Sequence, residues 1–141
     1  MQGFTKFSGH NSPKVIVLDT AAFLAAVQLQ LYNITLYTAP AVIDEVKDYE
    51  SRVRLEFASM VERFLVKAPE AKYFSEALEM VKKLRVLEKL STADLQVLAL
   101  SLELKDRGLE PVVITDDYIL QRVLIYIGID FRAVKTMGVK L

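Results

Sequence analysis

Lys14–Thr20, KVIVLDT, is the stretch from which the architecture of this chain can be deduced. Val15–Leu18 is an unbroken run of β-branched and leucine side chains, which is typical of a strand buried on both faces of a parallel sheet. Asp19 follows at the carboxyl end of this strand, where ligands bind in open α/β sheets. An aspartate here can also cap the following helix, because its oxygens accept hydrogen bonds from first-turn amides. The stretch therefore predicts a buried strand and leaves Asp19 open between ligand binding and capping.

A second apolar run repeats this arrangement further along the chain. Pro111–Thr115, PVVIT, predicts another buried strand, and Asp116 and Asp117 follow it. Helical spacing of apolar residues predicts helices at Ala21–Tyr32, Ala41–Phe64 with a break near 49–51, Tyr73–Glu88, Ser91 to a stop at Gly108, and Tyr118–Ile127. Short β-favouring runs predict strands at Ile34–Tyr37, Leu65–Ala68 and Ile129–Val134. This alternation predicts a three-layer α/β/α domain around a central, mostly parallel sheet.

Composition limits both the organisation and the chemistry. The 141 residues suit one folded domain at 14–141 behind a flexible lead-in at 1–13. The chain has no cysteine, and its one histidine, His10, lies in the lead-in, so thiolate sites are excluded and histidine-based sites are not expected. Eighteen basic and eighteen acidic residues give zero formal charge. The apolar run at 15–31 is interrupted by Asp19, Gln28 and Gln30, so we expect a cytoplasmic protein without a membrane span.

Acidic residues also occur early in two predicted helices, Glu45 in the second and Asp94 in the fourth. Strand carboxyl ends and the starts of the following helices share one edge of a doubly wound sheet, so these acids can converge with Asp19, Asp116 and Asp117. Two carboxylates about 4 Å apart repel by about 4 kcal/mol at an effective dielectric of about 20, and a cation or a raised pKa relieves this repulsion. Mg²⁺ and Mn²⁺ prefer oxygen ligands. The pattern therefore indicates metal-dependent phosphodiester hydrolysis, which requires no side-chain nucleophile.

Hydroxyl, basic and aromatic residues near these acids are further candidates. Thr20, Ser91 and Thr115 could orient water or the acids, and ordinary helix caps and strand-end hydroxyls explain them at least as well. Ser91 and Asp94 form a variant capping pair, with aspartate where glutamate or glutamine is usual. The candidates for RNA contact are Lys82, Lys83, Arg85, Tyr118 and Gln121. A solvated helix face explains the basic residues of this set as well.

Four short motifs in this order carry a family resemblance: LDT at 18–20, PAVIDEVKD at 40–48, LSTADLQVLALSLEL at 90–104 and VVITDD at 112–117. Together they resemble the PIN-domain ribonucleases over residues 14–134. The resemblance implies a PIN-like fold and a Mg²⁺- or Mn²⁺-dependent endoribonuclease that acts on single-stranded RNA. It implies that Asp19, Glu45, Asp94 and Asp117 are the catalytic metal ligands. The family's T-x-D pattern selects Asp117, and Asp116 is a neighbour that can add a ligand.

Within this family, EVKDYESRVRLEFA at 45–58 and the third and fourth motifs are most similar to the archaeal Nob family. That resemblance implies maturation of the 3′ end of small-subunit ribosomal RNA, with pre-rRNA or a pre-ribosomal particle as partner. Nob proteins carry a C-terminal zinc ribbon with cysteines, which this sequence lacks, and either a truncated sequence or a stand-alone relative would explain this difference. A VapC-type toxin, held inactive by an antitoxin partner, is the main competitor within the fold. A non-catalytic RNA- or protein-binding PIN module is a further alternative. Tyr126 and Phe131, which we expect to be exposed, leave room for a homodimer.

Overall fold

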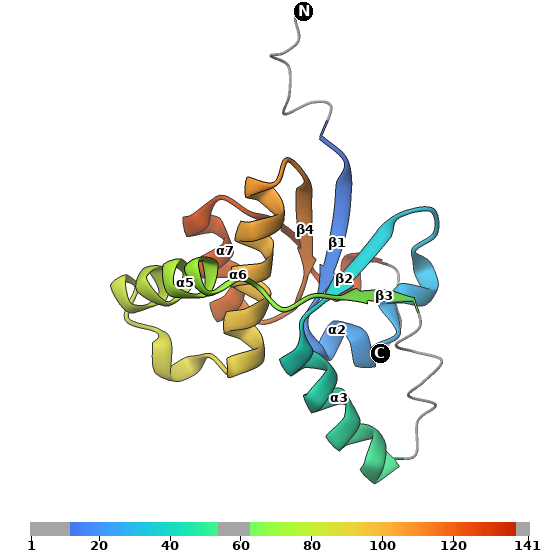
Figure 1. Cartoon of the computed structure of the whole chain (residues 1–141). Helices are drawn as coiled ribbons and strands as arrows, with labels where there is room; N and C mark the ends of the chain where they lie inside the picture. The colour runs from blue at the N-terminus through green and yellow to red at the C-terminus, as the bar shows by residue number, and fades with distance from the viewer. Residues whose placement is uncertain (1–11, 54–62, 138–141) are drawn as a thin grey trace, which may run out of the picture.

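The computed structural model describes residues 12–53 and 63–137 of the chain. A five-stranded, entirely parallel sheet lies at its centre, in the order β3–β2–β1–β4–β5 (Figure 1). The strands are β1 Lys14–Leu18, β2 Thr35–Thr38, β3 Phe64–Val66, β4 Glu110–Ile114 and β5 Asp130–Arg132. The α-helices are α2 Thr20–Leu24, α3 Pro40–Val53, α5 Ala71–Lys83, α6 Thr92–Asp106 and α7 Tyr118–Ile127, and the 3₁₀ helices are η1 Val27–Gln30, η2 Leu87–Lys89 and η3 Val134–Met137. The predicted α/β class is confirmed.

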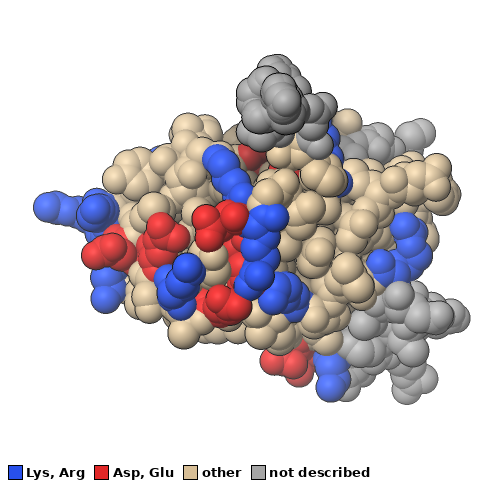
Figure 2. Space-filling view, turned by 45° about the horizontal axis from the view of Figure 1, so that its top comes forward, with Lys and Arg blue, Asp and Glu red and all other residues tan. Residues whose placement is uncertain are grey.

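Helices flank the sheet on both sides. α5 packs against α6 and α7 on one side, whereas α2 packs against η1 and α3 on the other (Figure 1). Figure 2 shows charged side chains of both signs intermingled on the side occupied by α5 and α6, in keeping with the zero net charge of the chain. Among the residues that the structure describes, no helix combines the length and apolarity needed to cross a membrane.

The order of the strands reverses between the neighbouring strands β1 and β4. The chain builds β1, β2 and β3 outward in one direction and then returns to add β4 and β5 on the other side of β1. Ligands bind in open α/β sheets where the strand order reverses in this way. Leu18 pairs in register with Ile114, so Asp19 and Thr115 leave the two neighbouring strands at the same level.

The predicted helix Ala21–Tyr32 is wrong in its extent. α2 ends at Leu24, Ala26 adopts a left-handed conformation with φ of 60°, and the short helix η1 follows. The break leaves Phe23 stacked on Phe64 of β3, with ring centroids 4.5 Å apart, and buries Val27. Phe23 and Val27 point to the core on both sides of the break, so helical spacing of apolar residues cannot reveal it.

The predicted helix Tyr73–Glu88 is also too long. α5 ends at Lys83, and Arg85 has a left-handed φ of 61°. Leu84 and Leu87, which continue the apolar spacing, pack against the core from the turn and from η2 instead. The basic residues predicted to share one helix face therefore extend beyond the helix.

Other element ends agree with the predictions to different degrees. α7 spans the predicted residues and closes at Gly128, with φ of 78°, and α6 ends just before Gly108. The predicted break near 49–51 is wrong because α3 continues to Val53.

The helix predicted to reach Phe64 cannot do so, since β3 begins there. The short strands shift or shorten by one to three residues, to Thr35–Thr38, Phe64–Val66 and Asp130–Arg132. Residues 1–11 and 54–62, including His10, lie outside the described residues.

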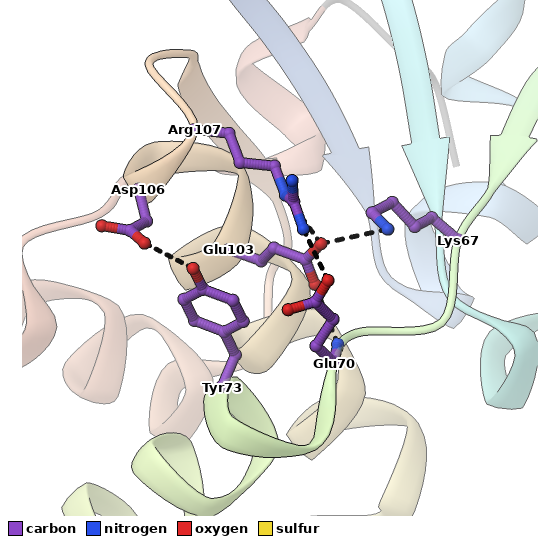
Figure 3. Close-up of polar contacts among 6 residues, drawn as sticks. All are labelled: Lys67, Glu70, Tyr73, Glu103, Asp106 and Arg107. Atoms are coloured by element: carbon purple, nitrogen blue, oxygen red, sulfur yellow. Dashed lines mark hydrogen bonds and ion pairs between the residues drawn. The ribbon is translucent and has the colours of Figure 1, made fainter.

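A buried carboxylate ties the connection between β3 and α5 to α6 (Figure 3). Glu103 of α6, whose side chain is fully buried, lies 3.0 Å from Lys67 Nζ and accepts hydrogen bonds from Arg107 Nε at 2.9 Å and from the Glu70 amide at 2.9 Å. Arg107 also pairs with the Glu70 carboxylate at 2.7 Å. Burial alone would raise the pKa of Glu103, but the bonds from Glu70, Lys67 and Arg107 outweigh it and lower this pKa below its ordinary value. The connection from β3 to α5 is thus held against α6 by the ion pairs and hydrogen bonds of Glu103.

Candidate active site

Asp19 lies almost completely buried at the carboxyl end of β1, with 5% of its surface exposed. Its Oδ1 accepts a hydrogen bond from the Ala22 amide at 2.8 Å, so it caps α2. Burial raises the pKa of Asp19 from 3.8 to about 6, against hydrogen bonds from Thr115 and Ala22 that lower it. The charges of Asp94 and Asp117 raise this pKa further. Asp19 is therefore both a cap and one of several interacting acids.

Asp94 occupies the third position of α6 and forms the predicted capping pair with Ser91. The Ser91 hydroxyl accepts from the Asp94 amide at 3.0 Å, and Asp94 Oδ2 accepts from the Ser91 amide at 2.9 Å. Burial raises the pKa of Asp94, the bonds with Ser91 oppose this, and the charges of Asp117 and Glu45 add to it. The start of α6 thus faces acids from two other parts of the chain.

The two acids after β4 point to different partners. Asp117 Oδ1 accepts from the Leu120 amide at 3.0 Å and caps α7, and its charge raises the pKa of both Asp19 and Asp94. Asp116 Oδ1 instead accepts from the Val134 amide at 2.7 Å, which ties the turn to η3. Asp117 is therefore the member of the pair that joins the other acids.

Glu45 reaches the same region from α3. Its Oε1 accepts a hydrogen bond from the Thr20 hydroxyl at 2.5 Å, and its charge contributes to the raised pKa of Asp94. Gln96 is not among the predicted site residues, yet its side chain accepts from the Ala41 amide at 2.9 Å and so joins the first turn of α3 to α6. Because glutamine on a helix face is usually solvated, only the fold reveals this contact.

Four acids, Asp19, Glu45, Asp94 and Asp117, thus gather from four elements at the reversal of strand order. Within the described parts of the chain, no three acidic side chains approach closely enough to hold one metal ion. Mg²⁺ commonly binds through one or two carboxylates and keeps several waters, so one or two of these acids could ligate an ion directly while the others contact its waters. Capping explains the local hydrogen bonds of the three aspartates, but a cap needs neither burial nor neighbouring negative charge.

The other candidate residues lie in different surroundings. Lys82, Lys83 and Arg85 are exposed, the first two in the last turn of α5. Tyr118 is 70% exposed at the start of α7, whereas the Gln121 side chain donates to the Thr115 carbonyl at 2.9 Å. A hollow of about 880 Å³ beside α5, α6 and α7 is lined by none of the four clustered acids.

The two aromatic residues predicted to be exposed at a homodimer interface differ in their exposure. Tyr126 is 52% exposed on α7, as expected, while Phe131 is half-buried against the core. The homodimer stays a prediction.

Known proteins share the sequence pattern and the fold of this chain. Residues 16–104 match the family described as the PIN domain of ribonuclease. The chain is 40% identical over 138 residues to ribonuclease VapC3 of Aeropyrum pernix, which covers 98% of this chain and 99% of that protein. It is 43% identical over 129 residues to endoribonuclease Nob1 of Pyrococcus abyssi, which covers 89% of this chain and 71% of that protein.

Solved structures agree on the fold. VapBC2 from Rickettsia felis, bound to a DNA fragment from its promoter, superposes with a TM-score of 0.61 at 14% identity over 84% of this chain and 98% of that one. VapBC-1 from Haemophilus influenzae gives a TM-score of 0.59 at 17% identity over 86% and 98% of the two chains. The matched residues 16–104 include most of β1, all of β2 and β3, and the acids at positions 19, 45 and 94, whereas β4, β5 and Asp117 lie beyond them. The chain belongs to the PIN-domain ribonuclease family.

Proposed function

We propose that this protein is an endoribonuclease that cleaves single-stranded RNA with the help of Mg²⁺ or Mn²⁺ at Asp19, Glu45, Asp94 and Asp117. The observation that carries the proposal is the burial of Asp19 and the half-burial of Asp94 close to further negative charge, which raises both pKa values. A cation removes this cost, since it favours the charged form of every acid around it. The names of the relatives, a ribonuclease and an endoribonuclease, support the same chemistry.

The side chains of the cluster suit distinct tasks in this reaction. A divalent ion held here would supply a more acidic water and offset the charge of the phosphate. Thr20 orients Glu45 through its 2.5 Å hydrogen bond, and Ser91 fixes Asp94 through the capping pair. Thr115 supports Asp117 by accepting from its amide at 3.0 Å. We assign Asp116 to holding η3, because its carboxylate already binds the Val134 amide.

Replacing Asp19 or Asp94 by asparagine tests this proposal. Asparagine caps helices about as well as aspartate, so both variants should fold while losing ion affinity and cleavage. The assay measures cleavage of a labelled single-stranded RNA with Mn²⁺, with Asp44→Asn on the exposed face of α3 as control. Wild-type cleavage rates in both Asp19→Asn and Asp94→Asn would show that these acids serve only as caps, whereas a wild-type protein that binds the RNA without cleaving it would be a non-catalytic binding module.

Two biological roles suit the proposed reaction. Maturation of the 3′ end of small-subunit ribosomal RNA is supported by 43% identity to an endoribonuclease Nob1. A toxin restrained by an antitoxin is supported by 40% identity over nearly the full length of a ribonuclease VapC3, and by fold similarity to VapBC complexes. Either role places the enzyme with cytoplasmic RNA.

The two roles predict different results, one in an RNA cleavage assay and the other in a growth assay. The first predicts one preferred cut in RNA that spans the 3′ end of the small-subunit rRNA, with little cutting of an unrelated RNA of equal length. The second predicts growth arrest when the wild-type protein, but not Asp94→Asn, is expressed alone. A single preferred cut without growth arrest would favour the ribosomal role.

A further inference from the structure

We propose that the turn after β4, beside the acidic cluster, binds RNA next to the cleaved bond. In this proposal Tyr118 stacks on a base, and Arg132 and Lys135 contact phosphates. This inference rests on the proposed ribonuclease function and adds the residues that position the substrate. We call these three residues the β4 rim.

Tyr118 is placed for stacking by its position and its exposure. It directly follows Asp117 and is the first residue of α7, yet 70% of its surface is exposed. An aromatic ring in this position gains nothing from the protein core, whereas it can cover one face of an unpaired base. Stacking of this kind tolerates any base, because every base has a flat face.

The backbone around Tyr118 is held rigidly. The Thr115 hydroxyl accepts from the Asp117 amide at 3.0 Å, and the Gln121 side chain donates to the Thr115 carbonyl at 2.9 Å. The Asp117 side chain accepts from the Leu120 amide at 3.0 Å, and this N-terminal cap fixes the first turn of α7. A ring on a backbone that is already ordered loses little conformational entropy when it binds a ligand.

Two cations flank this turn. The Arg132 carbonyl accepts from the Thr115 amide at 3.0 Å, which places the end of β5 beside the end of β4. Lys135 follows Val134, whose amide donates to Asp116 at 2.7 Å. Both side chains belong to exposed residues. A cation beside the acidic cluster offsets the repulsion between the acids and the phosphates of the RNA.

Acidic side chains do not neutralise the charges of Arg132 and Lys135, in contrast to those of Lys67 and Arg107, and the two residues are singled out among the unpaired bases by their place beside the turn after β4. Lys67 and Arg107 are engaged with Glu103 and Glu70. The Arg132 side chain donates to the neighbouring Phe131 carbonyl at 2.9 Å, and neither Arg132 nor Lys135 pairs with an acidic side chain in residues 12–53 and 63–137. Their charge is therefore available to a ligand.

A single tryptophan tests the stacking. The chain contains no tryptophan, so Tyr118→Trp keeps an aromatic ring at this position and makes it the only strong fluorophore. Tyr126→Trp is the matched control, because Tyr126 lies on the same helix two turns further from the acids and is 52% exposed. Both are combined with Asp94→Asn, so that the RNA stays intact, and titrated with a single-stranded oligoadenylate of about 12 nucleotides.

We expect quenching of the tryptophan at position 118 and not at 126, and loss of the quenching with an abasic oligonucleotide of equal length. Tyr118→Ala should weaken binding of the oligoadenylate about tenfold. Equal quenching at both positions, or none at 118, would overturn the inference. Emission at 118 that changes with protein concentration in the absence of RNA would also overturn it, because a second copy of the chain would then cover Tyr118.

The salt dependence of binding tests the phosphate contacts. The slope of log K against log salt is negative, and each cation removed from contact with a single strand should reduce its magnitude by about 0.7. For Arg132→Gln combined with Lys135→Gln we expect the magnitude to fall by about 1.4. Lys14→Gln should leave the slope unchanged, since Lys14 is exposed at the opposite end of β1. An unchanged slope in the double variant would contradict the assignment.

Cleavage by the wild-type protein separates this inference from the proposed function. If wild type cleaves the RNA and Tyr118→Ala cleaves it with the same KM, the role proposed for the β4 rim in RNA binding is wrong, while the nuclease assignment stands. If wild type does not cleave but the tryptophan at 118 is quenched, the nuclease assignment fails and the β4 rim stands.

Discussion

Asp19 is a helix cap whose carboxylate lies in the protein interior, and this combination has a measurable cost. Burial raises its pKa from 3.8 to about 6. Between about pH 4 and pH 6 the native protein therefore binds more protons than the unfolded chain, so its stability falls as the pH rises through this range. The penalty is fully present above about pH 6 and absent below about pH 4.

Asp19→Asn should remove this penalty. At about pH 8 we expect the free energy of unfolding to increase by about 1–3 kcal/mol, because asparagine still caps α2 and carries no charge. At about pH 4 the difference between variant and wild type should vanish. Urea unfolding at both pH values measures this. A variant that is less stable than wild type at the higher pH would show that the charge of Asp19 is favourable in the absence of metal.

At the scale of helices and strands, the sequence predicted those ends that carry a chemical marker. Ser91 and Gly108 bracket α6, and Gly128 closes α7 with a left-handed φ. The ends of α2 and α5 have no such marker, and apolar residues continue at helical spacing past both breaks. The positive φ at Ala26 and Arg85 is set by packing in the folded protein, and the helix propensities of these residues do not predict it.

The crossover from β3 to α5 depends on Glu103, which sequence reasoning did not single out. Glu103→Ala would leave the Glu70 amide without an acceptor and Lys67 without its ion-pair partner, and Arg107 would keep only the Glu70 carboxylate. We expect a loss of about 2–3 kcal/mol, below the usual cost of breaking a fully buried pair, because Lys67 and Arg107 are partly exposed.

Thermal or urea unfolding of Glu103→Ala and Glu103→Gln measures this loss. Glutamine keeps an acceptor and should recover part of the stability. Glu76→Ala, on the exposed side of α5, should change stability by less than about 0.5 kcal/mol. A Glu103→Ala variant as stable as Glu76→Ala would contradict the role of Glu103 in holding the crossover.

At the scale of the molecule, alternation of strands and helices predicted that the acids share one edge, and the described sheet agrees. Alternation does not fix the order of the strands, so the sequence could not show that β1 and β4 are neighbours in register. Nor could it show that Asp116 turns to η3 or that Gln96 joins α6 to α3, because both contacts join segments far apart in the chain.

Calorimetric titration of Mn²⁺ into the wild-type protein and into Asp94→Asn, at about pH 7.5, tests the central claim that the acids form a metal site. Binding to wild type should relieve the repulsion among Asp19, Asp94 and Asp117, and the loss of one ligand should weaken the affinity at least about tenfold. Wild-type protein that takes up no Mn²⁺, or a variant that binds it as tightly as wild type, would contradict the account and leave these aspartates as helix caps.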